Sequence, residues 1–173
     1  MVSEREFKDF MAGVCTPVAV VTAMADGLPH GTTVGSLTSL SLRPPMVTVA
    51  LDRRSKLLPK IQRTGRFGVN MLGAGQEDVA AAFAAPAADR FGATEWYADR
   101  DLPRLRGAPG WLVCLPKRFV EGGDHLLLLS QVTHISAVEA APLVYGHRMF
   151  GTHSAFAWRR HIPIADKIAA FVR

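Results

Sequence analysis

A dense group of charged side chains lies in the segment LDRRSKLLPKIQRTG, residues 51–65. Arg53, Arg54 and Lys56 surround Ser55 where the spacing of apolar residues predicts the start of a helix. The N-terminus of a helix carries the positive end of its dipole, so cations there are unfavourable unless an anion binds among them. The segment therefore fits an anion site. It also fits a solvated charged turn with Ser55 as the N-cap.

The preceding segment TTVGSLTSLSL, residues 32–42, is rich in hydroxyl groups. Alternation predicts one strand, with Ser36 and Thr38 on one face and Ser39 on the other. Hydroxyls and helix amides can both donate to phosphate oxygens. This supply of donors favours a phosphate cradle over the solvated turn, although the sequence pattern of a P-loop is absent.

Two further residues have chemistry that suits such a site. His125 directly follows the tight turn of EGGD, where it is either an ordinary surface imidazole or a group that orients a ligand. Arg90 lies in a long loop, where it is either solvated or grips an anion. Spacing alone leaves both alternatives open.

Metal and dinucleotide motifs are weak. Cys15 and Cys114 lie far apart without CxxC spacing, and the histidines form no HxxxH pair, so we expect no metal site. We interpret both cysteines as buried thiols. The GAG of residues 73–75 lies where a dinucleotide fingerprint would begin. Asp78 takes the place of its third glycine and no parallel strand returns, which argues against a Rossmann fold.

The overall composition bounds the class of protein. The 173 residues are 49% hydrophobic and 20% charged, which is typical of one folded domain. A net charge of +5 fits a small anionic ligand. The basic residues are scattered and lack interleaved aromatics, so nucleic-acid binding is not favoured. The apolar runs are too short for a membrane span, and the charged start is unlike a secretory signal, so we expect a cytoplasmic protein.

The elements that position these groups are predicted to be mostly strands, mainly antiparallel, with a few helices, as in a β-barrel rather than a βαβ fold. We expect a domain over residues 1–160 and a helical tail over 161–173. The long segment 86–110 shows no strong period and is predicted to be an irregular loop. Strands are predicted over residues 17–24, 32–42, 46–52 (buried on both faces), 66–72, 111–120, 125–138 and 142–151, and the other helices over 4–12, 55–65 and 76–85.

Read in order, six segments resemble the flavin reductase-like family, the short reductase components of two-component flavin monooxygenases. The resemblance covers about residues 6 to 151. It implies an FMN-binding split β-barrel that forms a homodimer, with flavin near the subunit interface. The segments are VAVVTA, DGLPHGTTVGSLTSLSLRPPMVTVALDRRSK, RFGVNML, FAAPAADRF, GGDH and PLVYGHRMFG.

The resemblance also implies roles for individual residues. His125 would lie beside the nicotinamide, and Arg148 matches a basic residue before a glycine in the last strand. The flavin phosphate would lie against Ser55 and its basic neighbours Arg54 and Lys56, and Asp52 would also belong to the cofactor-binding residues. The isoalloxazine and ribityl chain would lie along Thr33, Gly35, Ser36, Leu37, Thr38 and Ser39. The loop with Phe83, Arg90 and Phe91 would contribute to the flavin or nucleotide site.

The sequence departs from the family pattern at Gly35, where many relatives have asparagine in T-x-N-S, and at Pro17, where relatives usually have glycine. The implied activity is reduction of FMN or FAD by NADH or NADPH through hydride transfer. Reduced flavin would then pass to a separate monooxygenase. Two alternatives stay open: tightly bound FMN that reduces a ferric complex or a quinone, or a flavin-binding module without turnover.

Overall fold

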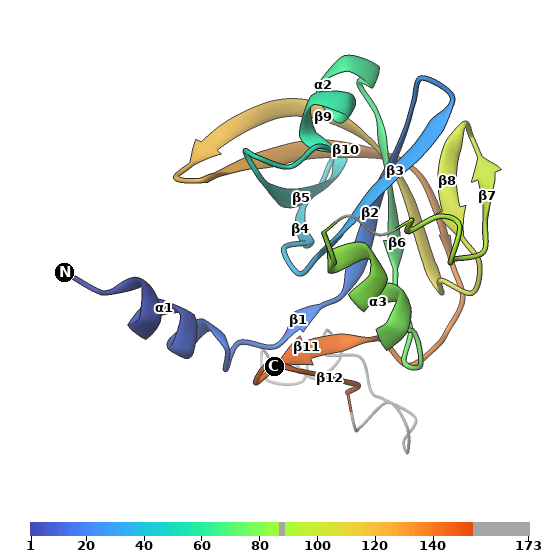
Figure 1. The fold of residues 1–173 in the computed structure, drawn as a ribbon. Helices are drawn as coiled ribbons and strands as arrows, with labels where there is room; N and C mark the ends of the chain where they lie inside the picture. Colours follow the sequence, from blue (N-terminus) through green and yellow to red (C-terminus); the bar gives the residue numbers. More distant parts are fainter. Residues whose placement is uncertain (87–88, 154–173) are drawn as a thin grey trace, which may run out of the picture.

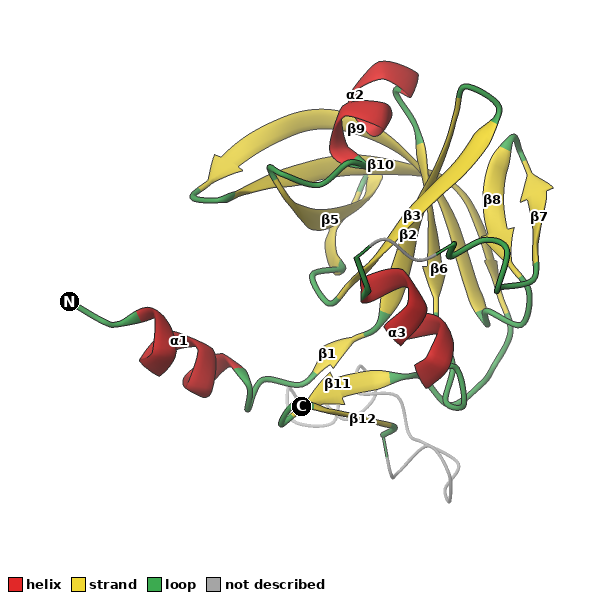
Figure 2. Ribbon diagram, in the orientation of Figure 1, coloured by secondary structure: helices red, strands yellow, loops and turns green. Residues whose placement is uncertain are grey.

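The computed structural model describes residues 1–86 and 89–153. Its centre is a curved sheet in which every pair of neighbouring strands is antiparallel (Figures 1 and 2). The seven strands run in the order β3 (Leu28–Val34), β2 (Ala19–Ala25), β6 (Phe67–Met71), β9 (Gly110–Gly122), β10 (His125–Ala137), β5 (Pro45–Asp52) and β4 (Thr38–Leu42).

Two small sheets and three helices complete the part of the chain that the structure describes. The predicted mainly β architecture with few helices is confirmed. The edge strands β3 and β4 do not pair with each other, so the curved sheet stays open between them. The remaining elements are β1 (Thr16–Pro17), β7 (Trp96–Asp99), β8 (Leu102–Leu105), β11 (Val144–Gly146), β12 (Met149–Gly151), α1 (Glu4–Met11), α2 (Leu58–Thr64) and α3 (Glu77–Ala84).

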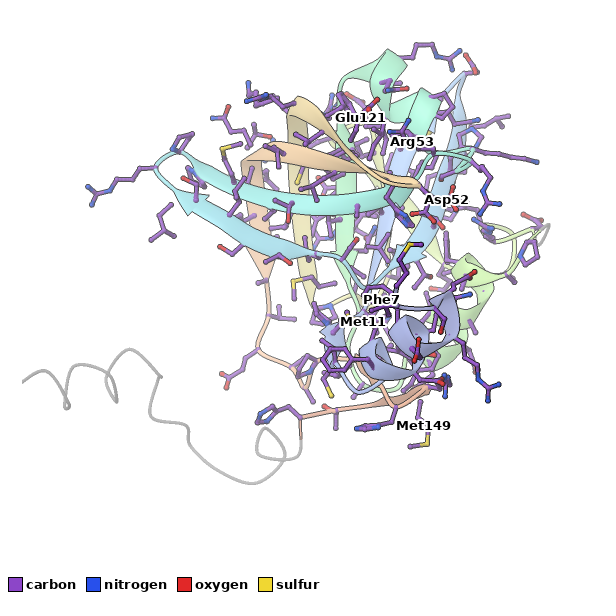
Figure 3. All side chains as sticks on the ribbon, turned by 90° about the vertical axis from the view of Figure 1, so that its left-hand side faces the viewer. Phe7, Met11, Asp52, Arg53, Glu121 and Met149 are labelled. Carbon is purple, nitrogen blue, oxygen red and sulfur yellow. The ribbon has the colours of Figure 1, made fainter. Side chains whose placement is uncertain are left out.

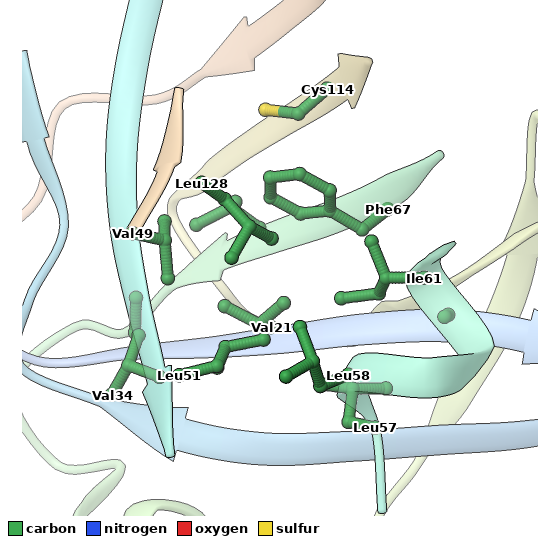
Figure 4. Packing of buried hydrophobic residues seen from close by; sticks show 13 residues of the cluster. Val21, Val34, Val49, Leu51, Leu57, Leu58, Ile61, Phe67, Cys114 and Leu128 are labelled. Atoms are coloured by element: carbon green, nitrogen blue, oxygen red, sulfur yellow. The ribbon is translucent and has the colours of Figure 1, made fainter. Parts of the chain in front are cut away.

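The main hydrophobic core fills the inside of the curved sheet and is covered by α2 (Figure 4). Phe67 from β6, Leu128 from β10 and Ile61 from α2 are fully buried there. A second cluster lies under α3 and includes Phe83, also fully buried. Burial of apolar area on this scale is the main force that holds the strands in place.

The predicted single strand over residues 32–42 is wrong. β3 ends at Val34, which pairs with Ala19 of β2 at one end of the sheet. β4 begins at Thr38, which pairs with Thr48 of β5 at the other end. Residues 35–37 carry the chain across the opening between the two edges. The hydroxyl-rich residues therefore do not share the pleat faces of one strand.

The predicted irregular loop over residues 86–110 is also wrong, because it contains the β7–β8 hairpin. Its two-residue turn has Arg100 at φ 53° and Asp101 at φ 58°. Two positive φ values are typical of a type I′ turn, which normally prefers Asn-Gly or Asp-Gly. Arg104 donates to Asp99 across the hairpin at 2.8 Å, and both side chains are largely buried.

Other predictions about strand limits and burial also differ from the structure. Residues 142–151 form β11 and β12 rather than one strand, because His147 and Arg148 adopt φ 51° and 60° in a tight turn. In β5 only Val49 and Leu51 are fully buried, so this strand is not buried on both faces. Cys15 is exposed rather than buried, while burial raises the pKa of the Cys114 thiol to about 12.

The predicted helix over residues 161–173 lies outside the described residues. Within the described part of the chain, the helices are all too short or too polar to cross a bilayer.

Candidate active site

A cavity of about 310 Å³ opens where the two ends of the sheet approach each other. One wall comes from the end of β3 and the segment after it, and the opposite wall from the end of β5. The turn before α2 and the start of β10 close it. Its lining residues are Thr32, Thr33, Val34, Gly35, Ser36, Ala50, Leu51, Asp52, Ser55 and His125.

Ser36 joins the two main walls through its hydroxyl. Its Oγ accepts a hydrogen bond from the backbone N–H of Ala50 and donates one to the Ala50 carbonyl, each at 3.0 Å. On the opposite edge of β5, Ala50 lies beside Leu127 of β10 in the sheet. One side chain thus satisfies both backbone groups of Ala50 where the β4 ladder has already ended.

Gly35 exposes bare backbone to the cavity. A Cβ added there would lie 2.7 Å from Oγ1 of Thr16, a distance that real Cβ atoms do not show. A larger residue at this position would therefore have to displace the Thr16 side chain or the cavity wall. Nearby, Thr33 donates its hydroxyl to the carbonyl of Ala80 in α3 at 2.7 Å, which fixes the end of β3 against that helix.

Two of the three cations in the segment after β5 are paired with carboxylates. Asp52 accepts from the backbone N–H of Arg54 at 2.7 Å and from its guanidinium at 3.0 Å. These bonds lower the pKa of Asp52 to about 2. Arg53 pairs with Glu121 of β9 at 3.3 Å (Figure 3). Lys56 has no ion pair among the described residues, so its charge is available to a ligand.

Ser55 is not the N-cap that the sequence predicts. The helix begins at Leu58 with Leu57 as its N-cap, and Pro59 lies in the first turn, where proline is tolerated. The Ser55 hydroxyl accepts from the backbone N–H of Leu57 at 3.3 Å and lines the cavity. The helix dipole therefore contributes less to anion binding at Ser55 than the sequence predicts. The side chains of Ser55 and Lys56 are the groups that can hold an anion.

His125 lies at the cavity on the first position of β10, directly opposite Asp52 in the ladder with β5. Its Nδ1 lies 2.8 Å from Oδ1 of Asp124, and its side chain is 43% exposed. This hydrogen bond lowers the pKa of the Asp124 carboxyl below its usual value. The imidazole therefore has one hydrogen-bond partner in the described chain and stays accessible to a ligand.

The structure does not bring the predicted loop residues to the cavity lining. Phe83 is fully buried in the core and meets Phe91 edge to face with centroids 5.0 Å apart. The structure thus places Phe83 in the core, and the predicted contribution of its loop to the flavin or nucleotide site stays a prediction. Arg90 donates to the carbonyls of Gly31 and Ala85, both at 2.5 Å, so its guanidinium ties the loop to the edge strand β3.

Other predicted residues also lie outside the cavity lining. Leu37 packs against the main core, while Thr38 and Ser39 are exposed on the edge strand β4. Arg148 forms an ion pair with Asp9 of α1, at a different surface.

Sequence reasoning missed four of the lining residues. They lie next to predicted ones. Three of them are apolar and carry no local signal of a binding site, whereas Thr32 belongs to the hydroxyl-rich segment 32–42. They are Thr32, Val34, Ala50 and Leu51.

Comparison with known proteins identifies the family. The model of the flavin reductase like domain matches residues 11–154. The chain belongs to this family. The resemblance inferred from the sequence motifs is therefore confirmed.

Individual relatives in this flavin reductase family are similar over most of the chain. The reductase component of a 4-nitrophenol 4-monooxygenase/4-nitrocatechol 2-monooxygenase from Rhodococcus opacus is 34% identical, over 86% of this chain and 80% of that protein. A flavin reductase (NADPH) from Lentzea aerocolonigenes is 37% identical, over 86% and 89%. A longer relative from Rhizobium meliloti is 38% identical over 131 residues, and the chain spans 42% of its length.

A solved structure agrees with the fold. The NADH:FAD oxidoreductase of Streptomyces globisporus, in complex with NAD and FAD fragments, superposes with a TM-score of 0.82 at 29% identity. The match covers 96% of this chain and 99% of that one. The open curved sheet is therefore the fold of a flavin reductase.

We predict that Ser36→Ala opens the cavity and destabilises the protein. The substitution leaves the N–H and carbonyl of Ala50 without their partner, which costs about 1–3 kcal/mol of unfolding free energy. Urea unfolding measures the loss, and Ser39→Ala on exposed β4 is the matched control, with an expected change near zero. Equal stability of the two variants would contradict the role of Ser36 as the link between the walls.

Proposed function

We propose that the protein is an NAD(P)H:flavin oxidoreductase that reduces FMN or FAD and releases reduced flavin to a separate monooxygenase. Hydride transfer requires that nicotinamide C4 lies close to flavin N5, and the two cofactors supply the redox chemistry. The chain must then provide shape, orientation and exclusion of water rather than a nucleophile. The proposal also places the protein in the cytoplasm, where both nucleotides are available.

The composition of the cavity carries this proposal. Its lining residues are mostly small or hydroxyl-bearing, and they include His125 and Ser55. Among the residues described, no group of histidine, cysteine and carboxylate side chains could hold a metal ion. A flat aromatic ring system fits such a wall, and bare backbone at Gly35 allows close approach.

The phosphate end of the flavin is assigned to the turn before α2. Ser55 lines the cavity there, and Lys56 next to it is exposed without an ion pair in the described chain. Arg54 is engaged with Asp52, so it contributes through the shape of the turn. One available cation and one hydroxyl form a weak phosphate site, which suits a flavin that binds as a substrate and leaves.

We also assign the molecule to a homodimer through α1. This helix buries none of its residues against its own chain and is too short to be stable alone. Phe10 is 75% exposed, and Phe7 and Met11 are exposed beside it. The nearby Met149 is 66% exposed on the same side of the molecule (Figure 3). In a dimer with a two-fold axis, the apolar patch of one subunit would pack against the same patch of the other subunit.

The proposed activity predicts that NAD(P)H oxidation in air depends on added flavin. Protein purified without flavin is assayed with NADH and with NADPH, each alone and with FMN, FAD or riboflavin. We expect turnover only where flavin is present, because reduced flavin leaves the cavity and is reoxidised in solution. Turnover without addition would instead identify a bound prosthetic group, and no turnover would identify a binding module.

The phosphate assignment predicts a selective defect in the double variant Ser55→Ala/Lys56→Ala. Loss of one cation and one hydroxyl should raise KM for FMN about tenfold. KM for riboflavin should not change, because riboflavin lacks the phosphate. Lys117→Ala, an exposed cation on β9, serves as the control. A similar rise with riboflavin would mean that the turn supports the ring site and not the phosphate.

The dimer assignment predicts that Phe7→Asp/Phe10→Asp is monomeric. Carboxylates in the centre of the apolar patch lose their hydration on association, which opposes dimer formation. Light scattering after size exclusion measures the mass of each species. Leu28→Asp, at an exposed apolar position on the β2–β3 hairpin, should remain dimeric. A dimeric double variant would place the interface elsewhere.

A further inference from the structure

Gly35 and Thr16 lie against each other beside the cavity. Gly35 belongs to the lining of the cavity, whereas Thr16 in β1 does not. An ideal Cβ on Gly35 would lie 2.7 Å from Oγ1 of Thr16 and 3.4 Å from its Cβ. The Thr16 side chain therefore occupies the space into which a side chain at position 35 would project.

The backbone at Gly35 does not itself require glycine. Gly27 and Gly65 show the usual reason for this residue, because they adopt φ 73° and 67° and an added Cβ would meet nothing within 4 Å. Gly35 is the reverse case, since its φ is not positive and an added Cβ would collide. The neighbouring Thr16 side chain, and not the conformation of the chain, is thus what excludes a larger residue.

β1 is held by its neighbours and keeps Thr16 in this place. Thr16 pairs with β11 in the small sheet. Two residues further on, Val18 donates its N–H to the carbonyl of Leu143 and accepts from the N–H of Leu72, each at 3.0 Å. A closely packed and hydrogen-bonded strand yields little to an added atom. We therefore expect the cavity wall at Gly35 to shift when its side chain is enlarged.

We propose that Thr16 is a positioning residue whose size restricts position 35 to glycine and keeps this part of the cavity wall open to the flavin. The inference rests on the proposed function for its ligand, whereas the size match itself concerns the protein alone. It also gives a physical reason for the departure from T-x-N-S, since asparagine at position 35 would need a smaller residue at position 16. Two positions together then determine what this wall can bind.

The first test is a thermal unfolding cycle with Thr16→Ala, Gly35→Ala and the double variant. Alanine normally stabilises a glycine site whose backbone conformation it can adopt. In the wild-type background we expect Gly35→Ala to lower Tm by about 5 °C because of the collision. In the Thr16→Ala background it should raise Tm by about 2 °C, because Oγ1 is gone. Gly151→Ala, where an added Cβ meets nothing, should change Tm equally in both backgrounds.

The second test measures the dissociation constant of riboflavin by quenching of its fluorescence, without turnover. Riboflavin lacks the phosphate, so the assay reports on the ring and the ribityl chain. Gly35→Ala should raise Kd about tenfold in the wild-type background and less than about twofold in the Thr16→Ala background. Thr16→Val keeps the size of the side chain and loses the hydroxyl, so it should leave Kd unchanged. A weaker complex with Thr16→Val would assign the effect to the hydroxyl and overturn the proposal.

The outcomes separate this proposal from the proposed function. A change in Tm of the same sign for Gly35→Ala in both backgrounds would overturn the size match, whatever the enzyme does. Equal rises in Kd in both backgrounds would overturn its role in ligand binding. A wild type that binds no flavin would refute the proposed function, and the unfolding cycle would still decide whether Thr16 restricts position 35.

Discussion

The cavity depends on Ser36, whose hydroxyl makes the hydrogen bonds to β5 that a neighbouring strand would otherwise make. Beyond Thr48, β4 no longer supplies partners to β5, and an exposed sheet edge would leave Ala50 unpaired. The hydroxyl of Ser36 meets both backbone groups of Ala50, so the two ends of the sheet approach without forming a ladder. A complete ladder would bring backbone against backbone and close the space. A single side-chain contact stabilises the edge and leaves room for a ligand beside it.

The charges around the cavity are balanced within the chain before any ligand binds. Arg54 is bound by Asp52, and Arg53 by Glu121, so most of the basic segment serves to shape the turn. Asp52 keeps its charge down to a pH of about 2, so this pairing persists over the physiological range. Among the described residues of this segment, Lys56 is the cation that is left without an ion pair, and it is the charge that the proposed phosphate site would use. A reductase that must release its product gains from such an arrangement, since tight phosphate binding would slow release.

The sequence predicted the mainly β class, the β9–β10 hairpin and the position of His125, because glycine turns and apolar alternation are local signals. It missed features that depend on distant partners. The β7–β8 turn uses Arg100 and Asp101 at positive φ, so it lacks the usual glycine signal. The chain leaves β3 after Val34 because the next strand, β4, pairs at the opposite end of the sheet. No local sequence pattern encodes this change of partner. Similarly, the sequence gives Arg90 the chemistry of an anion ligand, but no local pattern encodes its hydrogen bonds to the carbonyls of Gly31 and Ala85.

The departure from the family pattern at Gly35 connects the cavity to the surface around α1. Oγ1 of Thr16 occupies the space that a side chain at position 35 would need, so β1 lies directly beside this part of the cavity wall. β1 pairs with β11, and Arg148 in the next turn holds α1 through Asp9. A short chain of contacts thus links the exposed helix to the cavity.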